Sequence, residues 1–518
     1  MALADVHNRW NKFNKKQIFF TTGTDEHGLK VQMAASKAGI EPKLFCDGLA
    51  DKFKDLAQIG NIQYDRFIRT TDPDHALAVS AFWKTVWDKG YIYKGQHSGW
   101  YSVSDEAFYP ESEIIQSDEK NPKTGDFKMV AIESGSEVTF EVEENYFFKL
   151  SSFQDELIEM MESKNQMFIQ PKSYHTAILN DLKSTPLQDL SISRPSWRLQ
   201  WGLPVPGDED QKIYVWFDAL VNYLTSIGYP YKSIEQLPEM VHLIGKDITK
   251  FHCVYWPAFL MAAGMQPPQR VIVHGHWLMD GRKMSKSRGN VVDPVELAEK
   301  YDSDSLRLFL MRYSVLDSDG DFRESGLKSL RNEFIGKFGN LLIRCLSKNF
   351  DICRALNRLE TKTFDELLDD VNDDDFETEM KEIRDTVNGL HGIVDENYKN
   401  FEMHKAVQSI WAVGPMVNGM FDKQAPWTLK VKDDKSSDVN ESNQLKQDLI
   451  IFTSLDSLRC VLILLQAIIP NYSKVLLDRL RVDQDRRTAE WVGIGKDLTY
   501  GQNSTFKKGE QAPIPRIE

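Results

Sequence analysis

The stretch Val241-His242-Leu243-Ile244-Gly245-Lys246-Asp247 is an apolar run of strand length that ends in a glycine and two charged residues. An amphipathic run over 248–263 follows it directly, so the pattern predicts a strand, a loop and a helix. The same order is expected in three further segments: 17–28 followed by 29–37, 213–217 followed by 218–226, and 270–275 followed by a basic loop over 282–288.

These repeated units predict an α/β fold. Apolar strands that each lead into a helix build a doubly wound parallel sheet. In such a sheet the ligand binds beyond the carboxyl ends of the strands. We therefore expect the four loops that follow the strands to converge on one crevice.

Two regions have other patterns. Short alternating stretches such as 137–142, followed by a helical 146–164, predict an α/β insertion within residues 96–205. From about residue 325, apolar residues recur at helical spacing in 330–346, 404–420 and 445–480, which predicts an all-α bundle. Two polar segments, acidic 365–375 and 432–447, are expected to be exposed connectors.

The composition narrows the class of protein. A chain of 518 residues is too long for one core, so three or four domains are expected. No apolar run is long enough to cross a bilayer. The five cysteines lie far apart, which argues for a reducing compartment and against a disulfide framework.

The net charge of −14 argues against a broad nucleic-acid surface. Residues 323–348 are an exception, because they hold six basic side chains and two acidic ones. This segment is either a phosphate-contacting helix face or a merely solvated one.

The most specific string is Lys283-Met284-Ser285-Lys286-Ser287-Arg288-Gly289-Asn290. A polar loop of this kind offers phosphate donors, and a lysine can follow the charge that develops on a departing pyrophosphate. A charge-rich loop is more often a solvated surface, but this one follows a predicted strand at the carboxyl edge of the sheet. We therefore predict a nucleotide-phosphate loop. Neither GxxxxGK[ST] nor GxGxxG occurs, which excludes a P-loop NTPase and a dinucleotide-binding dehydrogenase of the usual types.

The KMSKS string resembles the second signature of class I aminoacyl-tRNA synthetases. The strings TTGTDEHG (21–28), WGLPVPGD (201–208), YVWFDAL (214–220) and HLIGKDITKFH (242–252) resemble methionyl-tRNA synthetases in particular, and the similarity runs from residue 2 to about 500. The resemblance implies a Rossmann-like catalytic domain split by an insertion and followed by an anticodon-binding bundle. It also implies the reaction: ATP activates L-methionine to methionyl-adenylate, and the methionyl group passes to the terminal adenosine of its tRNA.

The resemblance assigns a region to each part of the chain: 1–95 to the first half of the catalytic domain, 96–205 to the connective insertion, 206–265 to the second half, 266–325 to the KMSKS and stem-contact region, 326–500 to the anticodon-binding bundle, and 501–518 to a tail.

Six residues match the family's methionine site: Asp25, Trp216, Ala219, Tyr223, Ile248 and His252. A carboxylate such as Asp25 can hold the substrate ammonium, although a loop-capping aspartate is the alternative. A soft thioether suits aromatic walls with one weak donor, although an aromatic pair at this spacing is often only core. Ile248 and His252 stand four residues apart and are expected on one helix face. His27 matches the family as well, and we expect it to be structural.

The nucleotide site is implied in the same way. Gly245 and Asp247 match residues at the ATP ribose, and the backbone at Trp277 and Leu278 matches the adenine contact. Three residues match groups that act on the phosphates: Lys283, Lys286 and Arg194 in SISRPSW. Of these, Lys286 is the first choice for stabilising the charge of the transition state. ATP is expected to enter with Mg²⁺.

The anticodon readers of the family match Asn340, Arg344 and Trp427 in QAPW. Exposed Trp and Arg can stack on splayed bases while Asn reads a base edge. The alternative for Trp427 is a buried anchor of the bundle.

The chain departs from the family pattern in two places. Ser102 and Asp105 stand where many relatives have zinc-binding cysteines, and no cysteine lies between Cys46 and Cys253, so no structural zinc is expected. The family also begins with a strand and an HxGH-type motif for the ATP phosphates, whereas LADVHNRW stands at once after Met1-Ala2. We expect that the gene model is shortened and that a chain with this sequence is a poor catalyst. The alternative function is that of a catalytically impaired homologue that only binds tRNA.

The zinc-free insertion and the connectors rich in Asn, Lys and Asp indicate an enzyme of the mitochondrial matrix, with the bacterial or eukaryotic cytoplasm as the alternative. Apart from tRNA, L-methionine and ATP no partner is expected: neither a membrane nor a second copy, so the chain is expected to be a monomer.

Overall fold

The computed structural model describes residues 1–102, 107–120, 125, 127–132, 134–163, 168–232, 239–284, 290–429, 438–506 and 511–517. Two compact units account for the chain. Unit 1 comprises 1–19, 56–63 and 276–518, and unit 2 comprises 20–55 and 64–275. Each unit has its own apolar core, as the length of the chain requires. The six regions predicted from the sequence stay a prediction.

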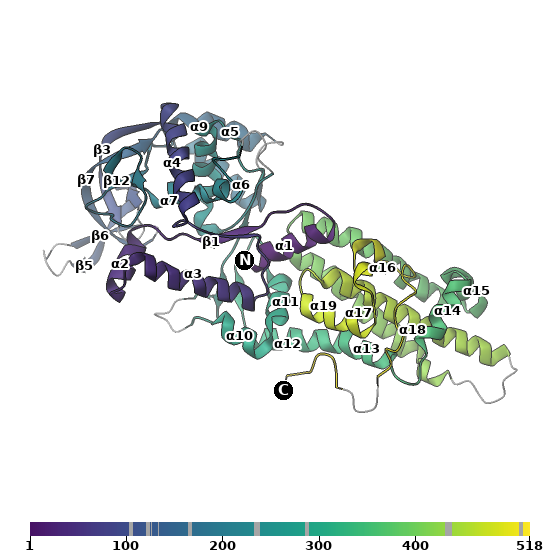
Figure 1. The fold of residues 1–518 in the computed structure, drawn as a ribbon. Helices are drawn as coiled ribbons and strands as arrows, with labels where there is room; N and C mark the ends of the chain where they lie inside the picture. The colour runs from purple at the N-terminus through teal and green to yellow at the C-terminus, as the bar shows by residue number, and fades with distance from the viewer. Residues whose placement is uncertain are drawn as a thin grey trace. The chain divides into compact units, whose positions relative to one another are not determined.

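Unit 2 contains two sets of parallel strands (Figure 1). Strand β1 (Thr21–Thr24) pairs in parallel with β2 (Arg66–Arg69). A second parallel set has the order β13 (Val241–Gly245), β14 (Arg270–His274), β8 (Phe168–Gln170). The sequence analysis identified β1, β13 and β14 as strands, and this α/β architecture is confirmed.

Helices accompany these strands in unit 2: α2 (Leu29–Ala38), α3 (Pro42–Ile59, whose last residues belong to unit 1), α4 (Pro73–Asp88), α5 (Gln154–Glu162), α6 (Lys172–Ser184), α7 (Val215–Leu220), α8 (Asn222–Ser226) and α9 (Trp256–Ala263). A 3₁₀ turn (Lys246–Ile248) and a π-helical turn (Phe251–Tyr255) connect β13 to α9. Helix α2 ends at Gly39 in the left-handed conformation, a common helix stop.

The predicted strand over 213–217 is wrong. Strand β12 (Asp208–Ile213) ends there, and it lies antiparallel between β10 (Ser193–Pro195) and β11 (Pro204–Val205). Val215–Leu220 is helix α7 instead. A five-residue apolar run fits a buried helix as well as a buried strand, and here the burial of 217–220 is satisfied by a helix.

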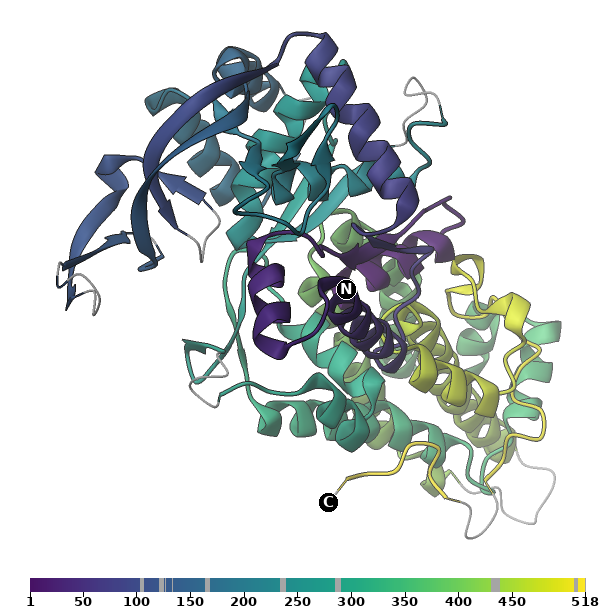
Figure 2. The same cartoon turned by 60° about the vertical axis from the view of Figure 1, so that its left-hand side comes forward.

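The insertion contains an antiparallel sheet with the order β4 (Ala107–Tyr109), β3 (Ile92–Ser102), β7 (Glu137–Phe148), β6 (Phe127–Ala131), β5 (Ile114–Lys120), and β9 (Leu190–Ser191) pairs with β7. Figure 2 shows β3 and β7, in blue, as a long bent ribbon. The alternation at 137–142 therefore predicted a strand correctly. The helix expected from 146 begins only at Gln154, because the alternation of β7 continues to Phe148.

Unit 1 is mainly helical, with α1 (Ala2–Phe13), α10 (Pro294–Tyr301), α11 (Ser303–Tyr313), α12 (Glu324–Phe334), α13 (Asn340–Cys345), α14 (Ile352–Thr361), α15 (Phe364–Val371), α16 (Asp374–Lys399), α17 (Met403–Gln424), α18 (Asp438–Leu465) and α19 (Pro470–Arg479). A small sheet of β16 (Arg282–Lys283), β15 (Trp277–Met279) and β17 (Gly320–Phe322) accompanies them. Helices α16, α17 and α18 pack side by side, which confirms the predicted bundle (Figure 1).

The acidic connector expected over 365–375 is wrong. Helix α15 occupies most of it, and a capping box in which Thr363 and Glu366 exchange hydrogen bonds starts this helix. Leu367, Leu368 and Val371 on its inner face are buried, so the acidic residues form only the outer face. The second expected connector lies partly outside the described residues, and its end, from Asp438, is the start of α18.

Among the residues that the structure describes, no helix combines the length and the apolar character needed to cross a bilayer.

Candidate active site

The loop after β1 carries Asp25, and glycines fix both ends of this loop. A Cβ on Gly23 would lie 1.8 Å from the carbonyl oxygen of Ile68 in β2, so only glycine allows the two strands to pair. Gly28 has a φ of 108°, which favours glycine, and its amide donates to the carbonyl of Trp201 at 3.1 Å. The backbone of the loop is therefore held on both sides of Asp25.

Glu26 holds the loop from within. Its side chain is 3% exposed and accepts two hydrogen bonds from the Arg69 guanidinium, at 2.6 and 2.9 Å. The Glu26 amide donates to Thr70 Oγ1 at 2.9 Å, and its carbonyl accepts from Trp201 Nε1 at 2.6 Å. A bidentate arginine pair of this kind is rigid. Glu26 thus points inward and leaves Asp25 at the surface of the site.

Asp25 is accessible to solvent, yet the pKa of its carboxyl is raised to about 6. Desolvation by the surrounding protein is the largest cause, and the negative charge of Asp218 is the next; His75 and His27 act in the opposite direction. Both observations fit a carboxyl that solvent reaches from one side while protein surrounds the others. Such a carboxylate is suited to an ammonium ligand.

Asp218 on α7 is buried and bridges two histidines. His27 Nδ1 lies 2.6 Å from one carboxylate oxygen, and His75 Nε2 of α4 lies 2.7 Å from the other. Burial alone would raise the pKa of Asp218, but the charge and hydrogen bonds of the two histidines lower it overall. The prediction that His27 is structural fits this position, since the side chain is only 8% exposed.

The predicted methionine residues Trp216 and Ala219 lie on α7. The Trp216 indole is half-buried and stacks on Phe251 with ring centroids 3.6 Å apart and planes 13° from parallel. Ala219 is buried one turn along the helix. A stacked aromatic pair with solvent access on one edge provides a polarisable wall for a thioether or an apolar side chain.

Tyr223 and His252 are joined by a hydrogen bond. The Tyr223 hydroxyl lies 2.7 Å from His252 Nε2, and His252 Nδ1 lies 3.0 Å from the carbonyl oxygen of Ile248. Since a carbonyl only accepts, Nδ1 carries the proton, and Nε2 of the neutral ring accepts from Tyr223. Desolvation lowers the pKa of His252 to about 4 and raises that of Tyr223, so both groups are neutral at physiological pH.

His242 on β13 extends this aromatic cluster. Trp256 Nε1 donates to His242 Nε2 at 3.2 Å, and the Tyr223 ring lies 4.1 Å from the imidazole. Burial lowers the pKa of His242 well below its ordinary value. Tyr223 and His252 are thus fixed by uncharged groups, as recognition of an uncharged side chain requires.

Gly245 and Asp247 stand at the carboxyl end of β13. Gly245 is the last residue of the strand and is in register with His274 of β14. Asp247 lies in the 3₁₀ turn that follows and is exposed. Both residues therefore lie at the edge of the sheet where ligand binding is expected.

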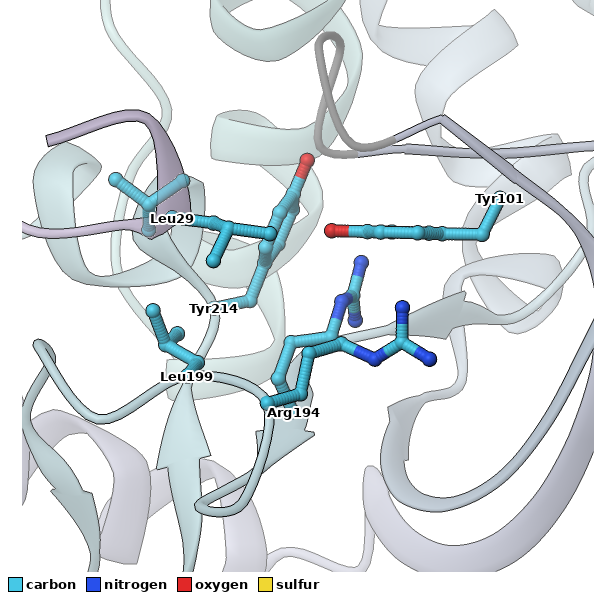
Figure 3. Close-up of a pocket in the computed structure, with 7 residues that line it drawn as sticks. Leu29, Tyr101, Arg194, Leu199 and Tyr214 are labelled. Atoms are coloured by element: carbon cyan, nitrogen blue, oxygen red, sulfur yellow. The ribbon is translucent and has the colours of Figure 1, made fainter. Parts of the chain in front are cut away.

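Arg194 lines a small hollow together with Leu29, Tyr101, Arg198, Leu199, Tyr214 and Val215. Its guanidinium lies 4.8 Å from the centre of the Tyr214 ring and 5.4 Å from that of Tyr101, and Nη1 donates to the Ser193 carbonyl at 2.7 Å. Figure 3 shows the hydroxyl of Tyr101 pointing toward Tyr214, with Leu29 and Leu199 across the hollow from Tyr101. Arg194 is 4% exposed in this arrangement.

The remaining nucleotide residues belong to unit 1. Trp277 and Leu278 lie on β15, where Trp277 packs on Phe309 with ring centroids 5.7 Å apart. Lys283 lies on β16 and is in register with Leu278. Lys286 lies outside the described residues, so its predicted contact with the phosphates stays a prediction.

The three predicted anticodon residues are also in unit 1. Asn340 begins α13, and Arg344 follows one turn later on the same helix. The Arg344 guanidinium lies 4.4 Å from the centre of the Phe421 ring and 5.9 Å from that of Trp427, and it also pairs with Asp422. Trp427 is 47% exposed, which excludes the alternative of a buried anchor.

Comparison with known proteins gives the family. The model for class I tRNA synthetases (M) matches residues 1–346. The mitochondrial methionine–tRNA ligase of Candida albicans is 41% identical over 100% of this chain and 92% of its own length, and that of Saccharomyces cerevisiae is 41% identical over 99% and 91%. The chain belongs to the methionine–tRNA ligase family. The human mitochondrial ligase is 40% identical over 94% of this chain and 81% of its own length.

Solved structures of the family agree. Mycobacterium tuberculosis methionyl-tRNA synthetase bound by methionyl-adenylate matches with a TM-score of 0.84 and 33% identity, over 99% of this chain and 95% of that one. Its apo form matches with a TM-score of 0.78 and 30% identity, over 100% and 94%. The predicted class I fold is therefore confirmed.

The sequence predicts no structural zinc in the insertion, and this stays a prediction. Among the residues described here, no group of three or more His, Cys, Asp or Glu side chains is arranged to hold a metal ion. Ser102 is described and buried, whereas Asp105 lies outside the described residues.

Sequence reasoning missed several groups of this site. Asp218 was visible as a lone acid inside the apolar run of YVWFDAL, a signal of a buried, partnered charge. His75 gave no signal, because its partner Asp218 is 143 residues away. Phe251 stands inside the string HLIGKDITKFH, but its stacking on Trp216 depends on the turn between β13 and α9.

Proposed function

We propose that the chain is a methionine–tRNA ligase that activates L-methionine with ATP and transfers it to the terminal adenosine of its tRNA through the residues described above. The proposal is supported by three features of unit 2 in a member of this family: a carboxylate after β1, a tryptophan stacked on Phe251, and a neutral Tyr–His pair. No observation on the described residues favours the alternative of a homologue that only binds tRNA. The enzyme belongs to the mitochondrial matrix, since the similar ligases of Candida albicans, Saccharomyces cerevisiae and human are mitochondrial.

Asp25 holds the methionine ammonium through a charge-assisted contact, for which the carboxyl must be ionised. The stacked Trp216 and the uncharged Tyr223–His252 pair, with Ala219 and Ile248, enclose the thioether. The site offers this side chain contact with aromatic faces and no net charge. A charged or strongly hydrated side chain would lose its water without compensation.

The nucleotide lies along the carboxyl end of β13 in this proposal. Gly245 allows close approach of the ribose, and exposed Asp247 accepts from its hydroxyls. Trp277 and Leu278 contact the adenine through their backbone. Lys283, Lys286 and Arg194 stabilise the charge on the leaving pyrophosphate. Mg²⁺ enters with ATP as part of the substrate and partly neutralises its phosphates.

The anticodon is read by the cluster of Asn340, Arg344 and Trp427 in unit 1. Trp427 exposes a π-face on which a base can stack, and Arg344 lies against two aromatic rings with its side chain 36% exposed. We also propose that the chain acts as a monomer and without structural zinc.

Methionine-dependent exchange of pyrophosphate into ATP tests the function. The full chain is assayed beside Asp25→Asn, which keeps the size of the side chain and removes the charge. The variant should lose about 10-fold to 100-fold in kcat/KM for methionine, the value of a hydrogen bond to a charged group. Asp51→Asn is the matched control, because Asp51 is 72% exposed and pairs only loosely with Lys54 at 3.5 Å.

Exchange that depends on methionine, falls with Asp25→Asn and is unchanged with Asp51→Asn supports the proposal. Absence of exchange at every methionine concentration, or equal activity of both variants, would contradict it.

A further inference from the structure

Asp218 has a position that its neighbours in sequence do not explain. It lies on α7 between Trp216 and Ala219, but its carboxylate is 1% exposed. One oxygen bonds His27 of the loop that carries Asp25, and the other bonds His75 of α4. A single buried side chain therefore connects α7 to both the ammonium-binding loop and α4.

The chain of hydrogen bonds continues to α8. His75 Nδ1 lies 3.0 Å from Thr225 Oγ1, and this hydroxyl lies 3.1 Å from the carbonyl oxygen of Val221. Thr225 stands two residues after Tyr223. The network thus reaches every element of unit 2 that supplies Asp25, Trp216 or Tyr223.

The protons of this network can be assigned from the acceptors. An ionised Asp218 only accepts, so His27 Nδ1 and His75 Nε2 must both donate to it. The hydroxyl of Thr225 has one proton, which goes either to the Val221 carbonyl or to His75 Nδ1. If the proton goes to the Val221 carbonyl, His75 Nδ1 is protonated and donates to the hydroxyl oxygen of Thr225. If it goes to His75, the unprotonated Nδ1 accepts it. His75 Nδ1 and the Thr225 hydroxyl therefore have a partner in both cases. The buried carboxylate is thus compensated in both states, as a stable buried charge must be.

We propose that His27, Asp218, His75 and Thr225 form a positioning relay for methionine binding, which holds the Asp25 loop, α7 and α8 in register and sets the electrostatic environment of the Asp25 carboxyl. This inference rests on the proposed function, since it assigns Asp25 to the substrate ammonium. None of the relay groups contacts the substrate. They act through the residues that do.

The electrostatic part follows from the charges that face Asp25. Asp218 on α7 and Glu26 on the loop are the acidic groups, and Glu26 is compensated by Arg69 of β2. His27 and His75 oppose the effect of Asp218, and Tyr223 on α8 is neutral. Asp218 is therefore the principal negative charge that disfavours ionisation of Asp25. Its removal should let Asp25 ionise at lower pH.

The test measures the Kd of L-methionine on the full chain from pH 5 to 8, by quenching of tryptophan fluorescence. In the unsubstituted chain the Kd should rise as the pH falls through about 6, because protonated Asp25 cannot pair with the ammonium. Asp218→Asn should weaken binding at pH 8 by about tenfold or more, since two hydrogen bonds to a charged acceptor change. It should also move the acidic rise in Kd to lower pH.

A second pair of variants separates positioning from general stability. Thr225→Val removes the far end of the relay with little change in shape and should weaken methionine binding about threefold to tenfold, the value of one hydrogen bond. Thr85→Val is its matched control. Thr85 Oγ1 also donates to the carbonyl four residues before it in a helix, at 2.9 Å, but it lies outside the relay. Both variants lose a hydrogen bond from the hydroxyl to a helix carbonyl, whereas only Thr225→Val should change the Kd.

The outcomes are distinct. Unchanged Kd and pH dependence in folded Asp218→Asn, or equal Kd values for Thr225→Val and Thr85→Val, would overturn the relay while the proposed function stands. If Asp218→Asn does not fold, the two threonine variants decide. If the unsubstituted chain binds no methionine at any pH, both the relay and the proposed function are wrong.

Discussion

Substitution of Tyr223 by phenylalanine tests how the thioether side of the pocket is held. The hydroxyl of Tyr223 lies 2.7 Å from His252 Nε2, and His252 is 2% exposed. Because His252 Nδ1 already donates to the Ile248 carbonyl, Nε2 depends on Tyr223 for its proton donor. Tyr223→Phe leaves a buried acceptor unsatisfied, which costs about 1–3 kcal/mol. The rings of Tyr223 and His242 keep their contact, so packing contributes little to this loss.

The assay follows unfolding of unit 2 by hydrogen exchange of the β13 and α9 amides in increasing urea. A matched control is Tyr231→Phe, because Tyr231 lies in the same unit and is 78% exposed. The control should leave exchange unchanged. Loss of less than about 0.5 kcal/mol in Tyr223→Phe would mean that His252 is not held as described, since even an ordinary hydrogen bond contributes that much.

Further predictions concern pH, the bundle and the tRNA. The folded protein holds the pKa of His252 at about 4, against an ordinary value of 6.5, so between these pH values the unfolded chain binds one more proton. The free energy of unfolding of unit 2 should therefore fall as the pH drops from 6.5 toward 4. Urea titrations at several pH values should show a weaker pH dependence for His252→Gln, and an equal dependence in both proteins would count against this prediction. Asp5→Asn should destabilise unit 1 by about 3–5 kcal/mol, because it breaks a buried ion pair in which Arg307 Nη2 lies 2.7 Å from the carboxylate. Hydrogen exchange of the α11 amides measures this loss of stability. A loss below about 1 kcal/mol, the usual value of an exposed ion pair, would contradict the prediction. Trp427→Ala should raise the KM for tRNA about tenfold, as loss of one stacked base would, with pyrophosphate exchange unchanged; an equal fall in exchange would contradict a role confined to tRNA.

The sequence was sufficient where local pattern and burial agree. Strands β13 and β14 were predicted correctly because each is an apolar run bounded by glycine or charge. The long helices α17 and α18 followed from apolar periodicity. Local pattern was insufficient at 213–217, where a short apolar run forms part of α7, and at 365–375, where acidic residues hide the apolar face of α15.

For the site, residue matches gave the candidate set in unit 2, but not the contacts that hold these residues. Asp25, Trp216 and His252 were predicted, whereas the bridge between Asp218 and His75 joins α7 to α4 across 143 residues. Such pairs depend on how elements pack, which no local pattern encodes.

The central claim is that Asp25 recognises the ammonium of methionine beside an uncharged thioether pocket. The most direct measurement compares the Kd of L-methionine with that of N-acetyl-L-methionine, which keeps the side chain and lacks the charge, on the unsubstituted chain and on Asp25→Asn. The unsubstituted chain should prefer L-methionine strongly, and the variant should bind both molecules about equally. Equal affinity of the unsubstituted chain for the two, or a preference that survives in Asp25→Asn, would contradict the account.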